Sequence, residues 1–349
     1  MNELRQTVTA LPKIDLHRHL EGSVRLETLI DIAQQYGIQM PDYNVEQLRP
    51  FVQMTPEQPH DMPTFMAKFI TLRQFYRSPQ VIRRVVHEAV EDAARDNIRY
   101  LELRFTPQAL TNIIGCGHSE VVGWVCETAH YAAKENDIDV GLIVSMNRHE
   151  GTTIGEKILQ AALDHRSDGV VALDLAGRES PEYPAAPFRY IFHRAKEAGL
   201  GVTVHAGEWL GSESMYDALL SLRADRIGHG VRSLEDPRLM EALVKRQITL
   251  EVCPTSNWHS GVVSSLKAHP LPELYRQQIR TTLNTDDPLV SNITLSDEIM
   301  VTLESMQMTL DDVKQQMLTA ASAAFLPPAA RAALVEKFQR WYENGSKPQ

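Results

Sequence analysis

The chain has 349 residues and a formal net charge of −10, with 43% hydrophobic and 23% charged residues. This balance is that of a soluble globular protein with a large core, and it excludes an extensively disordered chain. The acidic charge disfavours a nucleic-acid partner, because phosphate binding relies on clustered Lys and Arg, and it favours a small, uncharged or weakly charged ligand.

The cysteines and the first residues bear on location. Cys116, Cys126 and Cys253 are too few and too scattered for a disulfide framework, which predicts a reducing, cytoplasmic setting. Residues 1–11 contain no apolar segment of the kind found in a secretion signal. No apolar stretch approaches the roughly 20 residues that a membrane helix needs. We therefore expect a cytoplasmic protein with no membrane and no nucleic acid among its partners.

Short runs rich in Val, Ile and Leu alternate with longer segments of helical period, a pattern typical of repeated β-α units with a parallel sheet. In a chain of this length, eight such units predict a (β/α)8 barrel that forms a single domain over residues 1–349. The predicted strands cover residues 14–19, 100–105, 140–146, 170–175, 202–205, 226–227, 248–252 and 280–283.

The segment from 41 to 92 is too long for one connection after the first strand. It is predicted to be an insertion of extra helices over one end of the barrel, and its apolar part, residues 62–69, is predicted to form a lid. After the eighth strand, residues 310–323 and 329–341 have the pattern of closing helices.

Polar residues follow most of the predicted strands, at the end that forms the active-site face of a (β/α)8 barrel. The first strand ends in His17 and His19, and residues two apart in a strand point the same way, so both rings can face the barrel axis. A His-x-His pair alone is a weak signal, since two ordinary histidines explain it more often. Further candidates follow the fifth, sixth and eighth strands: His205, Glu208, His229, Asp286 and Asp287.

His17, His19, His205 and one aspartate would supply three nitrogens and one carboxylate, a set suited to one Zn²⁺ with a further position for water. Adjacent residues of an extended chain point in opposite directions, so we assign Asp286 to the metal and Asp287 to the substrate. Without the histidines, two aspartates before a proline would be interpreted as a turn or helix cap.

Zinc lowers the pKa of bound water from about 15.7 to about 7, which supplies a hydroxide nucleophile without a covalent intermediate. Glu208 lies three residues beyond His205, past a glycine that permits a tight turn, so its carboxyl group can lie beside the metal and donate a proton. His229, between two glycines, can approach and orient the water, although a lone histidine is more often structural.

A two-metal hydrolase barrel would require a bridging ligand, such as a modified lysine, at the end of the fourth strand. That strand instead ends in Asp174-Leu175-Ala176-Gly177, which favours one metal. Gly177 has no side chain, so its backbone can approach the edge of a flat ligand.

Several motifs together resemble the adenosine deaminase family, in the expected order from residue 11 to about residue 326. They are Leu16-His17-Arg18-His19-Leu20-Glu21-Gly22, Asp174-Leu175-Ala176-Gly177, His205-Ala206-Gly207-Glu208, Arg226-Ile227-Gly228-His229-Gly230, Cys253-Pro254-Thr255-Ser256-Asn257 and Leu283-Asn284-Thr285-Asp286-Asp287-Pro288.

The resemblance implies roles for these residues. Glu208 would pass a proton to purine N1, His229 would position the hydroxide, and Asp287 would hold N7, with the Gly177 backbone at N3. Ammonia would be expelled from C6, leaving a 6-oxo purine. The resemblance also implies zinc on His17, His19, His205 and Asp286, and substrate contacts from His19, Glu21, Gly177, Asp287, Phe65 and Phe69, with Met66 beside them on the lid helix.

Glu21 departs from the usual pattern. It stands where the adenosine branch of the family usually carries Asp, at the position that resembles the contact to the ribose 5′-hydroxyl. Glu occurs there in related adenine deaminases and in deaminases of modified adenine nucleosides, whereas Thr255 and residues 62–69 look closer to adenosine deaminases. Adenosine, with 2′-deoxyadenosine, is therefore the first expected substrate, in purine salvage.

Adenine and modified adenine nucleosides remain as alternative substrates. More distant alternatives are a non-catalytic nucleoside-binding barrel and a metal-dependent amide or ester hydrolase on the same fold.

Overall fold

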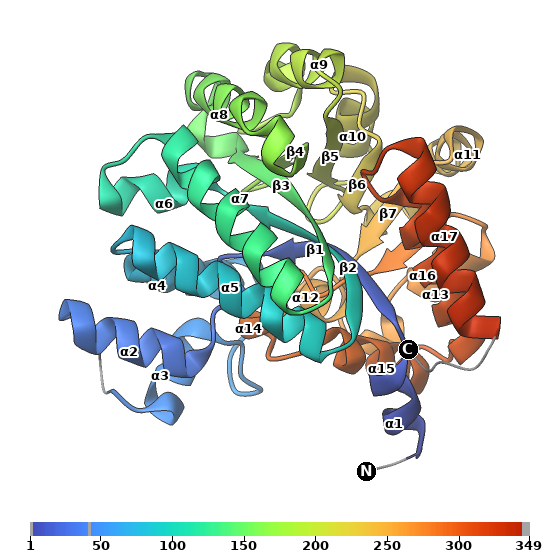
Figure 1. Cartoon of the computed structure of the whole chain (residues 1–349). Helices are drawn as coiled ribbons and strands as arrows, with labels where there is room; N and C mark the ends of the chain where they lie inside the picture. Colours follow the sequence, from blue (N-terminus) through green and yellow to red (C-terminus); the bar gives the residue numbers. More distant parts are fainter. Residues whose placement is uncertain (1–2, 41–42, 344–349) are drawn as a thin grey trace.

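Eight parallel strands form one sheet in sequential order, β1-β2-β3-β4-β5-β6-β7-β8, in a computed structural model that describes residues 3–40 and 43–343 (Figure 1). A parallel bridge between Arg18 and Asp286 joins the first strand to the segment after the eighth. The predicted (β/α)8 barrel is confirmed. The strands are β1 (Lys13–His19), β2 (Ile98–Phe105), β3 (Asp139–Asn147), β4 (Val170–Ala176), β5 (Gly201–Ala206), β6 (Arg226–His229), β7 (Thr249–Val252) and β8 (Arg280–Leu283).

Helices surround the barrel and cover its outer face, while side chains of the strands fill its interior, so nearly every strand residue is buried, as expected for a parallel sheet (Figure 1). The helices are α1 (Glu3–Ala10), α2 (Leu26–Tyr36), α3 (Val45–Val52), α4 (Met62–Leu72), α5 (Pro79–Arg95), α6 (Pro107–Ile114), α7 (His118–Glu135), α8 (Thr152–Asp164), α9 (Arg189–Glu197), α10 (Ser212–Tyr216), α11 (Pro237–Arg246), α12 (Pro254–His259), α13 (Leu271–Arg276), α14 (Pro288–Ser291), α15 (Leu295–Ser305), α16 (Leu310–Ala323) and α17 (Pro328–Glu343).

Extra helices follow the first strand, as the sequence predicts. Helices α2, α3 and α4 lie between β1 and α5 in the chain and gather at one side of the barrel in Figure 1. Asp61 is the N-cap of helix α4, and its carboxylate accepts a hydrogen bond from the Thr64 amide at 2.8 Å. The helix contains the apolar segment 62–69. Helix α5 packs against β2 and α7, in the outer ring of the barrel.

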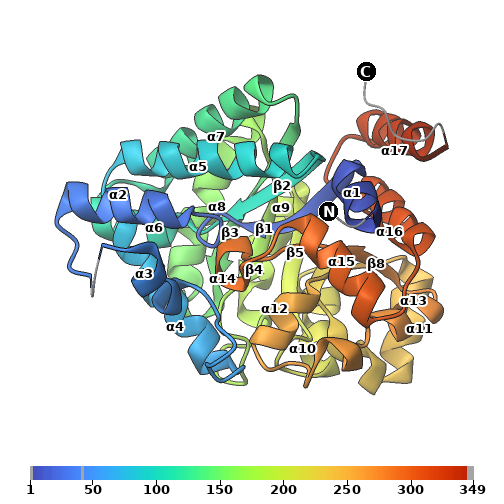
Figure 2. The same cartoon turned by 90° about the horizontal axis from the view of Figure 1, so that it is seen from below.

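The last helices cover the opposite part of the barrel. Helix α16 packs against β1 and β8, and α17 packs against α16 (Figure 2). The Tyr342 hydroxyl donates a hydrogen bond to the Pro12 carbonyl at 2.8 Å, which ties α17 to the residue before β1. Within the described ranges, no helix is both long and apolar enough to cross a membrane.

Charged side chains fill the barrel interior below the active-site face. Arg226 of β6 donates to Glu102 of β2 and to Glu251 of β7, both at 2.5 Å, and Arg104 donates to Glu251 at 2.7 Å. Burial of Glu251 alone would raise its pKa, but the charges of Arg104 and Arg226 hold that pKa well below its usual value. Glu251 is therefore a buried carboxylate whose charge is balanced by two guanidinium groups.

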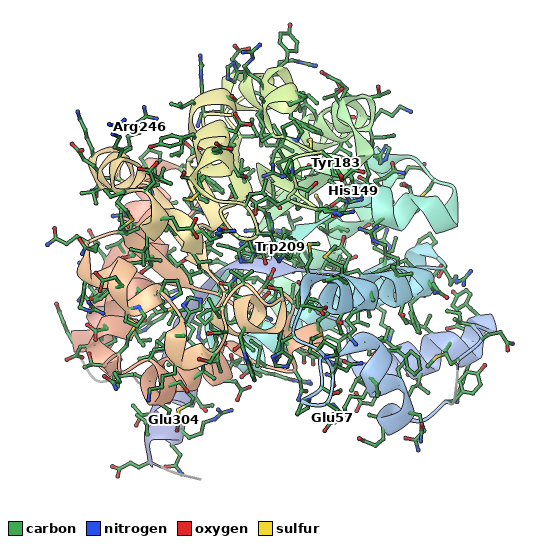
Figure 3. The ribbon with its side chains drawn as sticks, turned by 180° about the vertical axis from the view of Figure 1, so that it is seen from behind. Glu57, His149, Tyr183, Trp209, Arg246 and Glu304 are labelled. Atoms are coloured by element: carbon green, nitrogen blue, oxygen red, sulfur yellow. The ribbon has the colours of Figure 1, made fainter. Side chains whose placement is uncertain are left out.

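Replacing Arg226 with Met should remove the guanidinium group that Glu102 and Glu251 share. Loss of one partner from a buried ion pair costs about 3–5 kcal/mol, so the free energy of unfolding measured by urea denaturation should fall by about that amount. Arg246→Met, on the exposed surface of α11 (Figure 3), is the control and should change it by less than about 0.5 kcal/mol. Equal effects of the two substitutions would show that the interior network contributes nothing specific.

Candidate functional site

The seam between β1 and the end of β8 brings the first candidate ligands together. The His19 amide donates to the Asp286 carbonyl at 2.7 Å, and the Asp286 amide donates to the His17 carbonyl at 2.8 Å. Asp286 has a φ of 59°, a left-handed conformation that is uncommon for residues other than glycine. Its Oδ1 lies 3.2 Å from His17 Nε2 and 3.3 Å from His19 Nε2, and Ser256 donates to Oδ2 at 2.6 Å.

The histidines of β1, β5 and β6 converge at the same point. His19 Nε2 lies 3.2 Å from His205 Nε2, and ligand atoms of His17, His205, His229 and Asp286 all lie within 4.8 Å of one another. The structure thus brings together all four residues predicted to bind a metal. It also places His229 within reach, so five side chains compete for the coordination positions.

Buried carboxylates orient two of the rings. His17 Nδ1 lies 2.8 Å from Glu251 Oε2, and His205 Nδ1 lies 3.0 Å from Asp174 Oδ1. These carboxylates accept from protonated Nδ1 atoms, which leaves both Nε2 lone pairs directed at the cluster. His17 Nε2 is buried and has no hydrogen-bond partner among the described residues. Three imidazoles and a carboxylate arranged in this way fit a metal ion.

The loop after β5 holds Glu208 beside the cluster. The Glu179 carboxylate accepts four backbone N–H groups of this loop, those of Gly207, Glu208, Trp209 and Leu210, at 2.7–3.1 Å. Glu208 Oε2 lies 3.6 Å from His229 Nε2. Burial, and then the charges of Asp286 and Glu179, raise the pKa of Glu208 well above its usual value, so its carboxyl group can serve as an acid.

His229 lies at the end of β6 with a φ of 62°. A Cβ at the neighbouring Gly228 would lie 3.0 Å from His17 Cε1, so a side chain there would press against this ring. His229 Nδ1 lies 3.1 Å from Asn257 Nδ2, so its other nitrogen faces Glu208 and the cluster. Two residues of the site, His229 and Asp286, are thus held in the left-handed region that non-glycine residues rarely adopt.

A cavity opens beside the cluster, lined by both apolar and polar side chains as small-molecule sites are. All residues predicted to contact substrate line it: His19, Glu21, Gly177, Asp287, Phe65 and Phe69. Phe65, Met66 and Phe69 reach it from α4. Trp209, near the centre of the face seen in Figure 3, also lines it.

Glu21 and Asp287 each present an unpartnered oxygen among the described residues. Glu21 Oε1 accepts from the Thr106 amide at 2.7 Å, whereas its Oε2 and the Asp287 Oδ1 are buried without a hydrogen bond. Burial raises the pKa of both carboxyl groups. A Cβ on Gly22 would collide with the Asp287 carboxylate, so glycine at this position leaves room for Asp287.

Gly177 lines the cavity with a φ of 83°. A Cβ there would lie 2.9 Å from the Asn147 Cβ and 3.0 Å from His149 Nδ1. The position therefore requires glycine for both conformation and space, which leaves its backbone accessible to a ligand.

Some residues that support the site from behind, notably Glu179 and Glu251, were not predicted from the sequence. Glu251 carried a usable signal, because a charged residue between Leu250 and Val252 in a short strand of a parallel sheet implies a buried partner. Glu179 carried none, since it lies in a polar loop and its role depends on the fold of another loop. Arg73, another lining residue that was missed, comes from the turn after α4.

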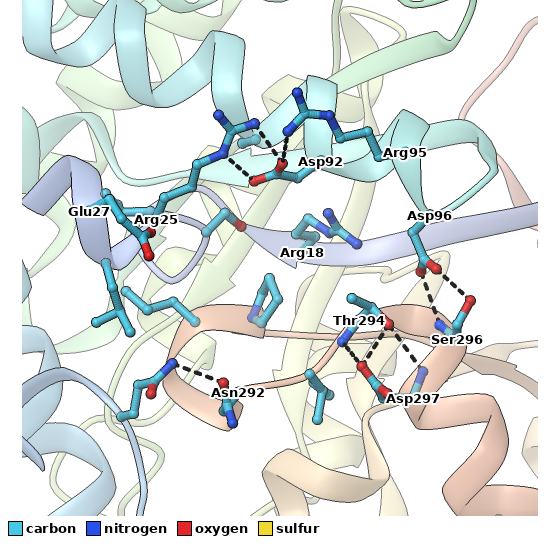
Figure 4. Close-up of a pocket in the computed structure, with 18 of the residues that line it drawn as sticks. Arg18, Arg25, Glu27, Asp92, Arg95, Asp96, Asn292, Thr294, Ser296 and Asp297 are labelled. Atoms are coloured by element: carbon cyan, nitrogen blue, oxygen red, sulfur yellow. Dashed lines mark hydrogen bonds and ion pairs between the residues drawn. The ribbon is translucent and has the colours of Figure 1, made fainter. Parts of the chain in front are cut away.

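A second cavity lies outside the strands, between α5 and the α14–α15 segment (Figure 4). Several of its charged side chains already have partners: Arg25 donates to Asp92 at 2.6 Å, and Asp96 accepts a hydrogen bond from the Ser296 amide at 3.0 Å. None of the described residues that line it is a histidine or cysteine. It therefore lacks the ligands found at the mouth of the barrel.

Comparison with known proteins agrees with this geometry. The model of a family described as adenosine deaminase matches residues 12–341. An adenosine deaminase of Klebsiella pneumoniae (strain 342) is 37% identical over 329 residues, covering 94% of this chain and 98% of that protein. One of Yersinia pseudotuberculosis serotype IB (strain PB1/+) is 38% identical over 327 residues, covering 94% and 97%.

A solved structure also matches over nearly the whole chain. An adenine deaminase from Arthrobacter aurescens superposes with a TM-score of 0.87 at 26% identity, covering 95% of this chain and 99% of that one. Together with the family match over most of the sequence, these similarities show that the chain belongs to the adenosine deaminase family of hydrolytic deaminases.

Proposed function

We propose that this chain is a single-domain, zinc-dependent enzyme of purine salvage in the cytoplasm, which converts adenosine and 2′-deoxyadenosine to inosine-type products and ammonia. The observation that carries the proposal is the buried Glu208 carboxyl group, 3.6 Å from His229 and beside the cluster of histidines and Asp286. A proton donor next to a metal site, in a cavity with further hydrogen-bonding groups, suits the addition of water to a purine ring.

One Zn²⁺ would be held by His17, His19, His205 and Asp286, because three imidazoles and one carboxylate suit this cation. When bound, zinc lowers the pKa of water so that hydroxide is available near neutral pH. Glu251 holds the ring of His17, and Asp174 that of His205, in the tautomer that metal binding through Nε2 requires.

The remaining groups act on the purine. Glu208, with its raised pKa, protonates N1 as water adds at C6. Asp287, whose pKa burial and Asp286 raise, is protonated and donates a hydrogen bond to N7. The Gly177 backbone faces N3, and His229 orients the water. The proton of the added hydroxyl group then passes to the amino group, which leaves as ammonia as the C6 carbonyl forms, while the product keeps the proton on N1.

We choose adenosine over adenine as the proposed substrate because the relatives at 37–38% identity are named adenosine deaminases, whereas the adenine deaminase structure is 26% identical. In this proposal the free Oε2 of Glu21 accepts the ribose 5′-hydroxyl, and α4, with Phe65 and Phe69, closes over the nucleoside. Adenine remains an alternative because of Glu21. A modified adenine nucleotide is another, since an N6-mAMP deaminase from Arabidopsis superposes with a TM-score of 0.84 at 26% identity.

The substrate is tested by the release of ammonia from adenosine and adenine, and of methylamine from N6-methyl-adenosine 5′-monophosphate, at equal concentration, with zinc-loaded protein and a chelator-treated control. We expect adenosine to give the highest kcat/KM and the chelator to abolish it. Faster release from adenine or from the nucleotide would reject the assigned substrate while keeping the chemistry. Activity that survives complete metal removal would contradict the zinc-dependent reaction itself.

Replacing Glu208 with Gln removes the acidic proton and keeps the size of the side chain. We expect kcat to fall by about 10²–10⁴-fold, while zinc content and binding of a purine nucleoside are retained. Glu213→Gln, at an exposed position of the same loop and helix region, should leave kcat unchanged. If E208Q kept more than about a tenth of the activity, Glu208 would not be the proton donor.

A further inference from the structure

A buried chain of hydrogen bonds runs from α13 to His229. The Leu271 backbone N–H donates to His269 Nδ1 at 3.1 Å, His269 Nε2 lies 3.3 Å from Asn257 Oδ1, and Asn257 Nδ2 lies 3.1 Å from His229 Nδ1. His269, Asn257 and His229 are 4%, 0% and 1% exposed, so water does not compete for these bonds. The first group in this series is the Leu271 backbone N–H, which can only donate.

The direction of every bond follows from that first donor. A backbone N–H can only donate, so His269 Nδ1 accepts and carries no hydrogen. The ring proton of His269 must then be on Nε2, which donates to Asn257 Oδ1. With its oxygen engaged as acceptor, Asn257 donates from Nδ2 to His229 Nδ1. Because Nδ1 of His229 accepts, the only place for its ring proton is Nε2.

The ring of His269 can accept a hydrogen bond at one nitrogen and donate one at the other, because it is neutral. Burial lowers the pKa of His269 to about 3, so the ring stays neutral across the working range of an enzyme. A neutral ring has one donor and one acceptor, and the Leu271 amide selects which nitrogen is which. Asn257 transmits that choice because an amide likewise has a donor end and an acceptor end.

The ligand histidines have the opposite arrangement. His17 and His205 place Nδ1 against the carboxylates of Glu251 and Asp174, which can only accept, so their Nε2 atoms are free to bind a cation. An imidazole nitrogen that carries a proton cannot be a metal ligand. Five side chains lie close enough to bind a metal ion. The hydrogen bonds to Nδ1 distinguish His17 and His205, whose Nε2 atoms are unprotonated, from His229, whose Nε2 carries the proton.

We propose that His269 and Asn257 are positioning residues that fix His229 as the tautomer protonated on Nε2. His229 is thereby kept out of the metal coordination and acts as a hydrogen-bond donor toward the reacting oxygen, and His19 takes the remaining coordination position. The consequence for catalysis rests on the proposed function, whereas the tautomer itself does not depend on which substrate is turned over.

The tautomer can be read directly from zinc-loaded protein labelled with ¹⁵N-histidine, using two-bond ¹H–¹⁵N correlation spectra. We expect His229 to show a protonated Nε2 and an unprotonated Nδ1, and His17 and His205 to show protonated Nδ1 atoms. A His229 protonated on Nδ1, or one whose Nε2 binds the metal, would overturn the proposal even if every variant failed to fold.

Asn257→Asp is the sharpest variant because a carboxylate of the same shape can only accept. It should draw the proton of His229 to Nδ1, invert its spectral pattern and lower kcat by about 10²-fold or more, with KM and zinc content little changed. Asn136→Asp, at the end of α7 and away from the site, is the matched control and should alter neither spectrum nor kcat.

Two substitutions of His269 complete the test. Gln retains an N–H donor toward Asn257, so His269→Gln should preserve the His229 pattern and lose much less activity than His269→Leu, which removes the donor. An unchanged His229 tautomer in both N257D and H269L would reject the relay. If the spectra behave as expected but adenosine is not deaminated, the relay stands and the proposed substrate is wrong.

Discussion

The barrel closes through two backbone hydrogen bonds between the end of β1 and Asp286, and the site depends on this closure. Because the bonds involve the backbones of His17 and His19, closing the barrel and assembling the ligands are the same event. The left-handed conformation of Asp286 then turns its carboxylate back onto both rings. Distortion of this seam would affect stability and metal binding together.

Around the seam, the fold sets the protonation state of each group by the partner placed behind it. Carboxylates accept from Nδ1 of His17 and His205, so the Nε2 atoms that face the cluster carry no proton. The Asn257 amide donates to Nδ1 of His229, so the proton of that ring is on Nε2. Burial, followed by the charges of Asp286 and Glu179, raises the pKa of Glu208 beside them. The interior arginines allow these acidic groups to remain buried, since Glu251 accepts from both Arg104 and Arg226 as well as facing His17. The site thus extends well into the barrel.

The sequence predicted the barrel and the groups that face the cavity because both leave short-range signals. Strand and helix periods identify the β-α units, and His17 and His19 follow a strand with the spacing that points both inward. Supporting residues were harder to predict because their partners are distant in the chain. Glu179 acts through four amides of another loop, and the relation of His269 to His229 requires Asn257 between them. Their roles depend on three-dimensional contacts that no local pattern encodes.

We propose that one zinc ion is bound by His17, His19, His205 and Asp286 while His229 stays outside the coordination sphere. Anomalous diffraction from zinc-loaded crystals, recorded on both sides of the zinc absorption edge, tests it most directly. We expect one peak per chain, within about 2.0–2.2 Å of the three Nε2 atoms and of an Asp286 oxygen, with no bond to His229. Two peaks, or one bonded to His229 in place of His19, would contradict it.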